Sequence, residues 1–465
     1  MLLRLVLVLA AMWSAIGHAS EKPHIILVMA DDQGYRDCGF TGHPYVKTPH
    51  LDDMAKHSLI FDHFHAAAPV CSPTRAAVLT GRTPVRVNVP QHGRYLRPHE
   101  ITIAEALKSK GYLTAHFGKW HVGSVQKESP TSPGGQGFDR WISALNFYDH
   151  DPYLSDQGIF AQYKGQGTIL ATDHAIAHLK KHALSQPTFT ILWFPSPHDP
   201  HRESSSNPEL YKGEKHAGYY QEITLIDEQI GRLRQTLRDL EISENTLLWY
   251  TSDNGGLVHE YSGGRAKKGS VYQGGLRVPS LIEYPSRFKP ATLTTPAISS
   301  DIYPTLLALT GTQVAHQPQL DGINLLPFIE GKKSTRSKPL AFWHNFSGGQ
   351  ATWSDRIIKQ LMEAQQTGEG TPLPERLFKD VNVFPTHGPD AHLKGHAALI
   401  DWPFKIHAIA RNNKITFELY HLDDDPMEAR NLAEKHPAKL RELAKTLKAW
   451  QHSVLRSHEG KDYPK

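Results

Sequence analysis

One cysteine lies in a setting that favours chemistry at its side chain. Cys71 is followed by Ser72-Pro73-Thr74-Arg75 and then by AAVLTGR at positions 76–82. Proline is favoured in the first turn of an α-helix, so the pattern predicts a helix that begins near Cys71. Because a helix N-terminus carries free N–H groups and the positive end of the dipole, Cys71 would face a position suited to an anion.

The number of cysteines limits the roles open to Cys71. The only other cysteine is Cys38, which excludes both a zinc site made of cysteines and a framework of disulfides. A single disulfide between Cys38 and Cys71 is the structural alternative in an oxidising compartment. We expect Cys38 to be a packed or free thiol rather than a catalytic one.

Polar residues follow three apolar runs of the sequence, at the point where each run ends. The runs occupy residues 24–30, 188–194 and 246–250. Continuous apolar runs of this length are typical of strands buried on both faces of a parallel sheet. Asp31 and Asp32 follow the first run, His198 follows the second, and Asp253 and Asn254 follow the third. Since ligands bind at the carboxyl ends of such strands, we expect these side chains to meet at one edge of the sheet.

The order of the elements predicts an α/β fold with two domains. Helical patterns lie between or after the apolar runs, at residues 101–110, 168–184, 219–240 and 301–310. We therefore expect a large domain over residues 20–335, with a central, mostly parallel sheet between helices. Alternating runs at 397–400, 404–410 and 415–422, followed by a helical pattern at 437–454, predict a smaller C-terminal α+β domain over 336–465 with antiparallel strands. Residues 345–395 lack a clear core pattern and are expected to run over the surface.

The N-terminus and the charge balance indicate an exported protein. Arg4 precedes an apolar run at 5–16, and small residues follow near Ala19. The pattern predicts a signal peptide over 1–19, cleaved near residue 19, and a secreted or periplasmic product. The alternative is a membrane anchor, but the run is shorter than the ~20 residues of a span, so no stable membrane insertion is expected. The 51 Lys and Arg against 47 Asp and Glu give no sign of a nucleic-acid partner.

The segment around Cys71 resembles the signature of the type I, formylglycine-dependent sulfatases of the alkaline phosphatase-like superfamily. Cys71, Pro73, Thr74 and Arg75 match C-x-P-[ST]-R, and the LTGR of residues 79–82 follows in register. The resemblance implies an alkaline phosphatase-like fold and hydrolysis of sulfate esters. It also implies a formylglycine-generating (sulfatase-maturating) enzyme as a partner, which would oxidise Cys71 to formylglycine (3-oxoalanine), the nucleophile once hydrated.

The resemblance also implies a metal site. Asp31 and Asp32 correspond to the first metal-binding pair of the family, and Asp253 and Asn254 to the second, with residue 71 completing the set. Carboxylate, amide and hydroxyl oxygens suit one Ca²⁺, with Mg²⁺ as the alternative, and do not suit Zn²⁺.

Two further segments resemble family motifs that bind sulfate. In GKWHVG at 118–123, Lys119 would bridge the nucleophile and a sulfate oxygen, and His121 would act as a base. In the segment 268–279, Lys268 would be a second sulfate lysine. Lys267 is its competitor if the register slips, and Gln273 replaces the more common Glu.

The family pattern assigns two more catalytic positions. His198 would bind sulfate and protonate the leaving oxygen. Arg75 would hydrogen-bond the formylglycine region and neutralise charge. Asn146, His201 and Arg94 are weaker candidates for sugar contacts, and a surface role is the alternative for each.

Four functions are compatible with the sequence. We expect a sulfatase acting on a sulfated polysaccharide or its oligosaccharides, because export and the many aromatic and His residues suit such a substrate. The alternatives within enzymes are an arylsulfatase for small aryl sulfates and a phosphonate or phosphate ester hydrolase. A non-catalytic protein that binds sulfated glycans is the alternative outside enzymes.

Overall fold

The computed structural model describes residues 22–412 and 414–463. The expected signal peptide lies outside them. Within these residues ten strands form one sheet in the order β11-β2-β10-β9-β1-β8-β4-β5-β6-β7. The strands are β1 (His24–Ala30), β2 (Leu59–Phe61), β4 (Leu113–Lys119), β5 (Arg140–Ala144), β6 (Tyr153–Asp156), β7 (Ile159–Gln162), β8 (Thr188–Trp193), β9 (Thr246–Ser252), β10 (Ser280–Glu283) and β11 (Ala291–Leu293). A separate pair joins β3 (Phe64–His65) to β12 (Ala297–Ile298).

The centre of the large sheet is parallel, as predicted. β1 runs parallel to β8 and β9, and β4 runs parallel to β8 and β5. Antiparallel strands flank this centre, since β10 opposes β9 and β6 opposes β5. All residues of β1, β8 and β9 are buried, which explains their unbroken apolar sequences.

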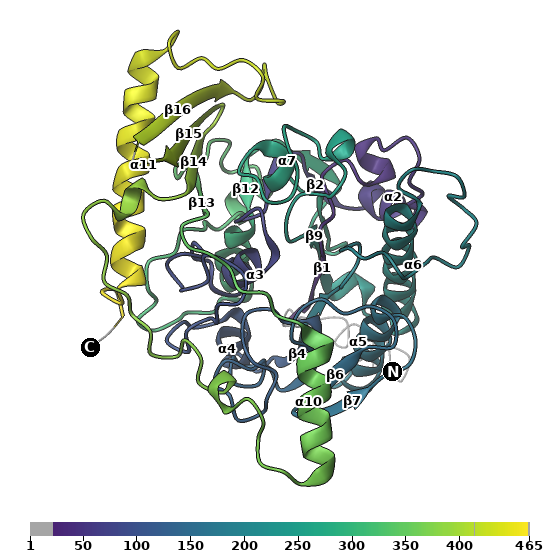
Figure 1. Cartoon of the computed structure of the whole chain (residues 1–465). Helices are drawn as coiled ribbons and strands as arrows, with labels where there is room; N and C mark the ends of the chain where they lie inside the picture. The colour runs from purple at the N-terminus through teal and green to yellow at the C-terminus, as the bar shows by residue number, and fades with distance from the viewer. Residues whose placement is uncertain (1–21, 413, 464–465) are drawn as a thin grey trace, which may run out of the picture.

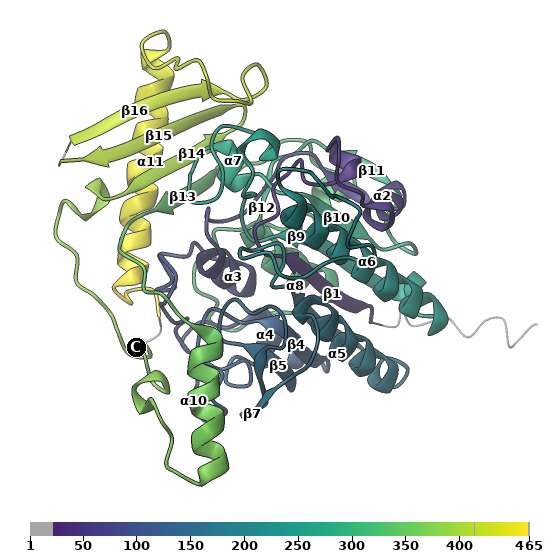
Figure 2. The same ribbon diagram turned by 45° about the vertical axis from the view of Figure 1, so that its right-hand side comes forward.

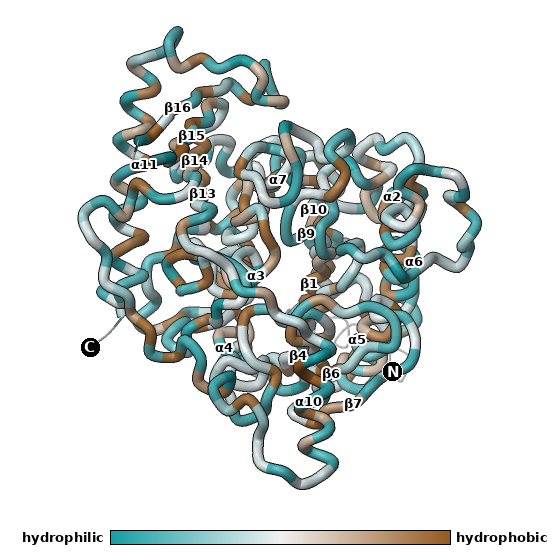
Figure 3. Tube along the Cα trace, viewed as in Figure 1, coloured by the Kyte–Doolittle hydropathy of each residue, from teal (hydrophilic) through white to brown (hydrophobic). Residues whose placement is uncertain are grey.

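Helices cover both faces of the sheet (Figures 1 and 2). The α-helices of the described residues are α2 (Pro49–Lys56), α3 (Cys71–Thr80), α4 (Ile103–Lys108), α5 (Gly167–His182), α6 (Ala217–Asp239), α7 (Gln273–Leu276), α8 (Ile302–Thr310), α9 (Leu326–Ile329), α10 (Ser354–Thr367) and α11 (Pro437–His458), of which α11 belongs to the C-terminal unit. Alternate residues of β1 enter two cores: Ile25 and Leu27 pack with α3, α4 and α8, and Ile26 and Val28 pack with α2, α5 and α6. Hydrophobic residues gather along the central strands and hydrophilic ones along the outer loops (Figure 3).

A second sheet near the C-terminus matches the predicted α+β unit. It comprises β13 (Leu340–His344), β14 (His396–Asp401), β15 (Phe404–Arg411) and β16 (Lys414–His421), all antiparallel to their neighbours. Leu443, Leu447 and Val454 of α11 pack in one core with residues of this sheet. Among the residues that the model describes, no helix combines the length and the apolarity needed to cross a membrane.

The structure differs from the sequence expectation within residues 345–395. Helix α10 lies in this segment, and its Ile357, Ile358 and Leu361 are buried in the core of the large sheet. Gln365, near the end of α10, accepts a hydrogen bond from the backbone N–H of Phe160 of β7, with 3.0 Å between Oε1 and N. The apolar residues have helical spacing, but the Gly- and Pro-rich sequence around them conceals so short a pattern.

Candidate functional site

Cys71 is the first residue of α3, as the sequence predicts. Val70 before it is extended, and every residue of α3 is buried. Thr74 Oγ1 fixes the entry into the helix, because it accepts from Ala68 N and donates to Ala68 O, each at 3.0 Å. Cys71 is a free thiol, as is the buried Cys38, so the alternative of a disulfide between them is wrong.

The register of two strands brings the acidic pairs together. β1 and β9 are parallel with Ala30 opposite Ser252, so the residues that follow each strand are neighbours at the carboxyl edge. Asp32 N donates to Asp253 Oδ1 at 3.2 Å, and Asn254 Nδ2 donates to Asp32 Oδ1 at 2.7 Å. Asp31, Asp32, Asp253 and Asn254 are all fully buried.

Three cationic side chains pair with these carboxylates. Arg75 donates from Nε and Nη2 to Asp253 Oδ2, at 3.1 and 2.6 Å. Lys119 Nζ, at the end of β4, lies 2.6 Å from Asp31 Oδ2. Lys268 Nζ lies 2.5 Å from Asp32 Oδ2, whereas the neighbouring Lys267 ammonium is exposed and donates to a backbone carbonyl, that of Leu257. The structure therefore brings Lys268 to the cluster and leaves Lys267 outside it.

His198 approaches the same carboxylates from the end of β8. Its Nε2 lies 3.7 Å from Asp32 Oδ2. Its Nδ1 lies 2.6 Å from the carbonyl oxygen of Asp199, which can only accept, so Nδ1 carries a hydrogen. Nε2 is then the ring nitrogen that faces the carboxylates.

His121, close to the cluster, has a strained backbone conformation. Its φ of +60° lies in the left-handed region, which is unfavourable for a non-glycine residue. Its carbonyl accepts from Ser72 Oγ at 2.6 Å, which ties it to the start of α3. Both ring nitrogens are buried without a hydrogen-bond partner among the described residues. Burial, followed by the charges of Lys119 and Arg75, holds the pKa of His121 well below its usual range, so the ring is neutral.

The electrostatics of the cluster are those of crowded carboxylates among fixed cations. Burial acts to raise the pKa of Asp31, but Lys119, His198, Arg75 and Lys268 outweigh it and hold that pKa below its usual value. Burial and the neighbouring Asp31 carboxylate raise the pKa of Asp253, against the effect of Arg75. A further cation between these carboxylates would relieve the repulsion.

The donor set fits a hard metal ion. One ligand atom each from Asp31, Cys71 and Asp253 lie within 4.8 Å of one another, as do those of Asp31, Asp32 and His198. Asp31 Oδ1 and Asn254 Oδ1 are buried and accept no hydrogen bond in the described part of the chain. Such orphaned oxygens are costly unless something binds them, and a Ca²⁺ or Mg²⁺ ion would do so.

The three weaker candidates have contacts within the protein. His201 Nε2 lies 3.0 Å from Pro197 O, and the ring packs against Tyr219. The Arg94 guanidinium pairs with Asp380 at 3.5 Å. Asn146 Nδ2 donates to Thr352 O at 2.8 Å. None of these contacts joins the carboxylate cluster.

Gln273, which departs from the family pattern, also lies outside the cluster. Its Oε1 lies 3.0 Å from His65 Nε2, and its backbone N–H donates to Glu428 Oε2 at 2.6 Å. The substitution of Glu by Gln therefore changes a contact behind the Lys268 loop rather than one with the carboxylates.

His92 is a candidate that the sequence analysis missed. It is half-buried, and no hydrogen bond of its ring to another described residue is found. Burial lowers its pKa, and the positive charges of Lys268 and Lys119 lower it further, which places His92 within electrostatic reach of both lysines. Twenty-nine histidines make any single one a weak signal in the sequence.

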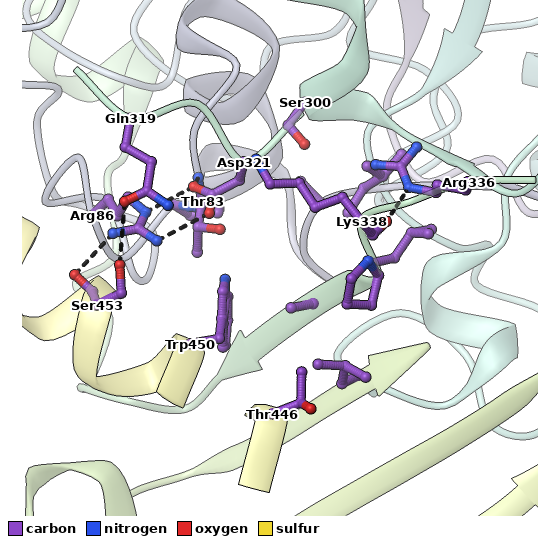
Figure 4. Close-up of a pocket in the computed structure, with 17 residues that line it drawn as sticks. Thr83, Arg86, Ser300, Gln319, Asp321, Arg336, Lys338, Thr446, Trp450 and Ser453 are labelled. Atoms are coloured by element: carbon purple, nitrogen blue, oxygen red, sulfur yellow. Dashed lines mark hydrogen bonds and ion pairs between the residues drawn. The ribbon is translucent and has the colours of Figure 1, made fainter. Parts of the chain in front are cut away.

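A cavity of about 270 Å³ lies away from the cluster, between the two units of the chain (Figure 4). Thr83 and Arg86, which line it, follow the C-terminal end of α3, and Cys71 is at the opposite end, ~15 Å along the helix. Arg86 is paired with Asp321 at 2.8 Å and Arg336 with Asp301 at 2.6 Å. With these charges satisfied inside the protein, the cavity offers less to a sulfate group than the cluster does.

Comparison with known proteins places these residues in a recognised family. The family model described as Sulfatase matches residues 23–312. Human arylsulfatase A is 32% identical over 367 residues, covering 70% of this chain and 71% of its own. An ulvan-active sulfatase from Formosa agariphila is 31% identical, covering 77% of this chain and 75% of its own. The crystal structure of Ps i-CgsB in complex with k-i-k-neocarrahexaose superposes with a TM-score of 0.76 at 23% identity, covering 93% of each chain.

Proposed function

This chain belongs to the sulfatase family and is a sulfuric ester hydrolase; we propose that it removes sulfate from a sulfated polysaccharide or its oligosaccharides, with formylglycine made from Cys71 as nucleophile. The observation that carries the proposal is the meeting of Cys71 with three buried carboxylates and two lysines at the carboxyl edge of the sheet. A sulfate ester is an anion, and these fixed cations next to a helix N-terminus are suited to bind it.

The roles proposed for the side chains follow from their charges. When residue 71 is formylglycine, its hydrate supplies an oxygen nucleophile. Lys119 and Lys268 would hold the sulfate oxygens, because each ammonium is held in place by an ion pair with a carboxylate of the cluster. His121, neutral and without a hydrogen-bond partner in the described chain, would accept a proton during sulfate release. His198 Nε2 would deliver a proton to the leaving sugar oxygen.

Arg75 would act indirectly. Its guanidinium donates to Asp253 from Nε and Nη2, and to the carbonyl of Lys119 from Nη1 at 3.1 Å. It would therefore orient Asp253 and the end of β4 rather than contact the substrate. Asp31, Asp32, Asp253, Asn254 and residue 71 would hold one Ca²⁺, which offsets sulfate charge. Mg²⁺ would use the same ligands.

The substrate class rests on the relatives and on the site. One of them is an ulvan-active sulfatase, and the structural neighbour was solved in complex with k-i-k-neocarrahexaose. We propose that His92 contacts the sugar, because its half-buried ring lies within electrostatic reach of both sulfate lysines. Asn146, His201 and Arg94 already contact other residues of the protein. Each would have to give up that contact in order to bind the sugar.

Maturation and export complete the proposal. Residues 1–19 would direct export and be cleaved near residue 19, giving a periplasmic or secreted enzyme. A formylglycine-generating enzyme would convert Cys71, and protein that escapes conversion would keep the thiol.

The test is sulfate release from a panel of substrates. The panel holds carrageenan, ulvan and glycosaminoglycan oligosaccharides, an aryl sulfate and a phosphonate monoester. The Cys71→Ala variant is the control, and a mass spectrum of the peptide containing residue 71 establishes its conversion. We expect sulfate from a glycan with the parent protein and none with the variant. Turnover of the phosphonate alone, or full activity of Cys71→Ala, would contradict the proposal.

A further inference from the structure

A segment that links the two units of the chain crosses the edge of the sheet where the site lies. We call residues 345–353, between β13 and α10, the strap. In both orientations the strap passes alongside α3 on its way to α10 (Figures 1 and 2). At its start Gln91 Nε2 donates to Asn345 Oδ1 at 3.0 Å, and in its middle Gln350 N donates to His92 O at 3.0 Å. The strap is therefore fastened to the loop that carries His92.

The far end of the strap is fastened to the end of β5. Thr352 O accepts from Asn146 Nδ2 at 2.8 Å, and Ser354 Oγ accepts from Leu145 N at 3.1 Å. Leu145 and Ser354 are buried. The backbone carbonyl of Thr352 and the side chain of Ser354, on either side of Trp353, are thus held by hydrogen bonds to residues at the end of a strand of the large sheet.

Trp353 is nevertheless exposed. Its side chain is 68% accessible, whereas the other tryptophans among residues 22–412 and 414–463 are buried or half-buried. A tryptophan fixed in place with its indole in water gains little for stability. It is, however, what a site needs for stacking, because a rigid aromatic ring loses little conformational freedom when a ligand binds.

The position of Trp353 relates it to the proposed sulfate site. Asn146, which holds the strap, precedes Phe147, and the Phe147 ring packs on His198 with 4.8 Å between ring centroids. His198 in turn lies 3.7 Å from Asp32 of the cluster. From the cluster to Thr352, the residue before Trp353, the contacts run through the side chains of His198, Phe147 and Asn146. They place the end of the strap beside the site, where the sugar next to the reacting one would lie.

We propose that Trp353 is a stacking platform for the sugar ring next to the one that bears the scissile sulfate. The inference rests on the proposed function and extends it, because it makes the substrate an oligosaccharide or polymer rather than a monosaccharide or a small aryl sulfate. The apolar face of a pyranose ring would lie on the indole, while the sulfated ring occupies the cluster.

Binding to an inactive protein separates this inference from catalysis. Sulfated tetrasaccharides of carrageenan, ulvan and chondroitin, and the sulfated monosaccharides of each, are titrated into Cys71→Ala protein by calorimetry. We expect Trp353→Ala to weaken tetrasaccharide binding about three- to tenfold and to leave monosaccharide binding unchanged. Trp353→Phe should retain most of the affinity, because the ring face remains.

The matched control is Ile159→Ala. Ile159 is 66% exposed on β7, near the opposite end of α10, and its loss should change neither affinity. The stacking platform would be overturned if Trp353→Ala lost the same affinity for tetrasaccharide and monosaccharide, or lost none. It would also be overturned if the Cys71→Ala protein bound no tetrasaccharide. Tetrasaccharide binding that depends on Trp353, in a protein whose parent releases no sulfate, would instead leave the platform standing and refute the proposed function.

Discussion

Glu428 of the C-terminal unit accepts a hydrogen bond from the backbone N–H of Gln273, with 2.6 Å between Oε2 and N. Glu428 is fully buried and also pairs with Lys405 at 2.9 Å and His407 at 2.8 Å. Lys405 Nζ in turn donates to Val271 O at 2.8 Å. These contacts hold the loop that leads from Lys268 into α7, so the smaller unit supports a side chain of the proposed sulfate site from behind.

Replacing Glu428 with Gln should therefore affect both stability and turnover. It leaves the buried Lys405 ammonium without its carboxylate, which costs about 3–5 kcal/mol of unfolding free energy. Adding Lys405→Met should recover much of that loss of stability, because it removes the buried ammonium that Glu428→Gln leaves without a partner. Denaturant unfolding measures the stability. Steady-state kinetics at a temperature where both variants are folded should show a raised KM, since Lys268 is less well held; an unchanged KM in Glu428→Gln would refute a positioning role.

The adjacent lysines of the 267–268 pair offer a sharp comparison. Lys268 reaches Asp32, while Lys267 points to the surface. Lys268→Met should lower kcat/KM about 10²- to 10³-fold, the range for loss of one charged group that stabilises a transition state. The kcat/KM of Lys267→Met should stay within about twofold of the parent value, since this ammonium lies outside the cluster. Substitution at such an exposed site changes the free energy of unfolding by no more than ~0.5 kcal/mol. Initial rates on the substrate found by the panel give both values. Equal losses would show that the register of the loop is not the one described.

Removal of divalent metal should destabilise the protein. A cation among Asp31, Asp32 and Asp253 relieves repulsion in the folded state, and at a hundredfold excess over Kd it adds about 2.7 kcal/mol. The melting temperature should therefore fall with EDTA and recover with added Ca²⁺.

The matched variants for this metal effect are Asn254→Ala and Asp423→Asn. Asn254→Ala removes a buried oxygen that has no hydrogen bond in the described chain, so the Ca²⁺-dependent rise should shrink. Asp423→Asn removes an exposed carboxylate from another acidic run and should leave the rise unchanged. A calcium effect that is the same in all three proteins would argue against the site.

Mild acid should destabilise the fold through His65. Burial, followed by the charge of Lys405, lowers its pKa from 6.5 to about 3. The folded protein keeps this ring neutral, while the unfolded chain binds a proton below about pH 6.5, so unfolding is favoured as the pH falls from 6.5 toward 3. At pH 5 this amounts to about 2 kcal/mol. His65→Gln should flatten the dependence of melting temperature on pH between 7 and 5; an unaltered slope would show that His65 is protonated when folded.

Much of the fold and of the proposed site could be predicted from the sequence because the relevant signals are local. Unbroken apolar runs mark β1, β8 and β9, and the polar residues that end them have to appear at the carboxyl edge once the strands are parallel. Pro73 in the first turn indicates where α3 starts. The motif around Cys71 specified the family by itself, since its residues are contiguous.

Other features were decided only by the tertiary structure. Which of Lys267 and Lys268 joins the cluster depended on the folded loop, which places the Lys268 ammonium next to Asp32. The packing of α10 on the large sheet, and the exposure of Trp353 at its start, depended on contacts with Leu145 and Asn146, about 200 residues earlier in the chain. His92 comes within electrostatic reach of Lys268 and Lys119 only through folding. Periodicity and motifs describe a residue's neighbours along the chain. Burial and electrostatics are set by neighbours in space, which come together only when the chain has folded.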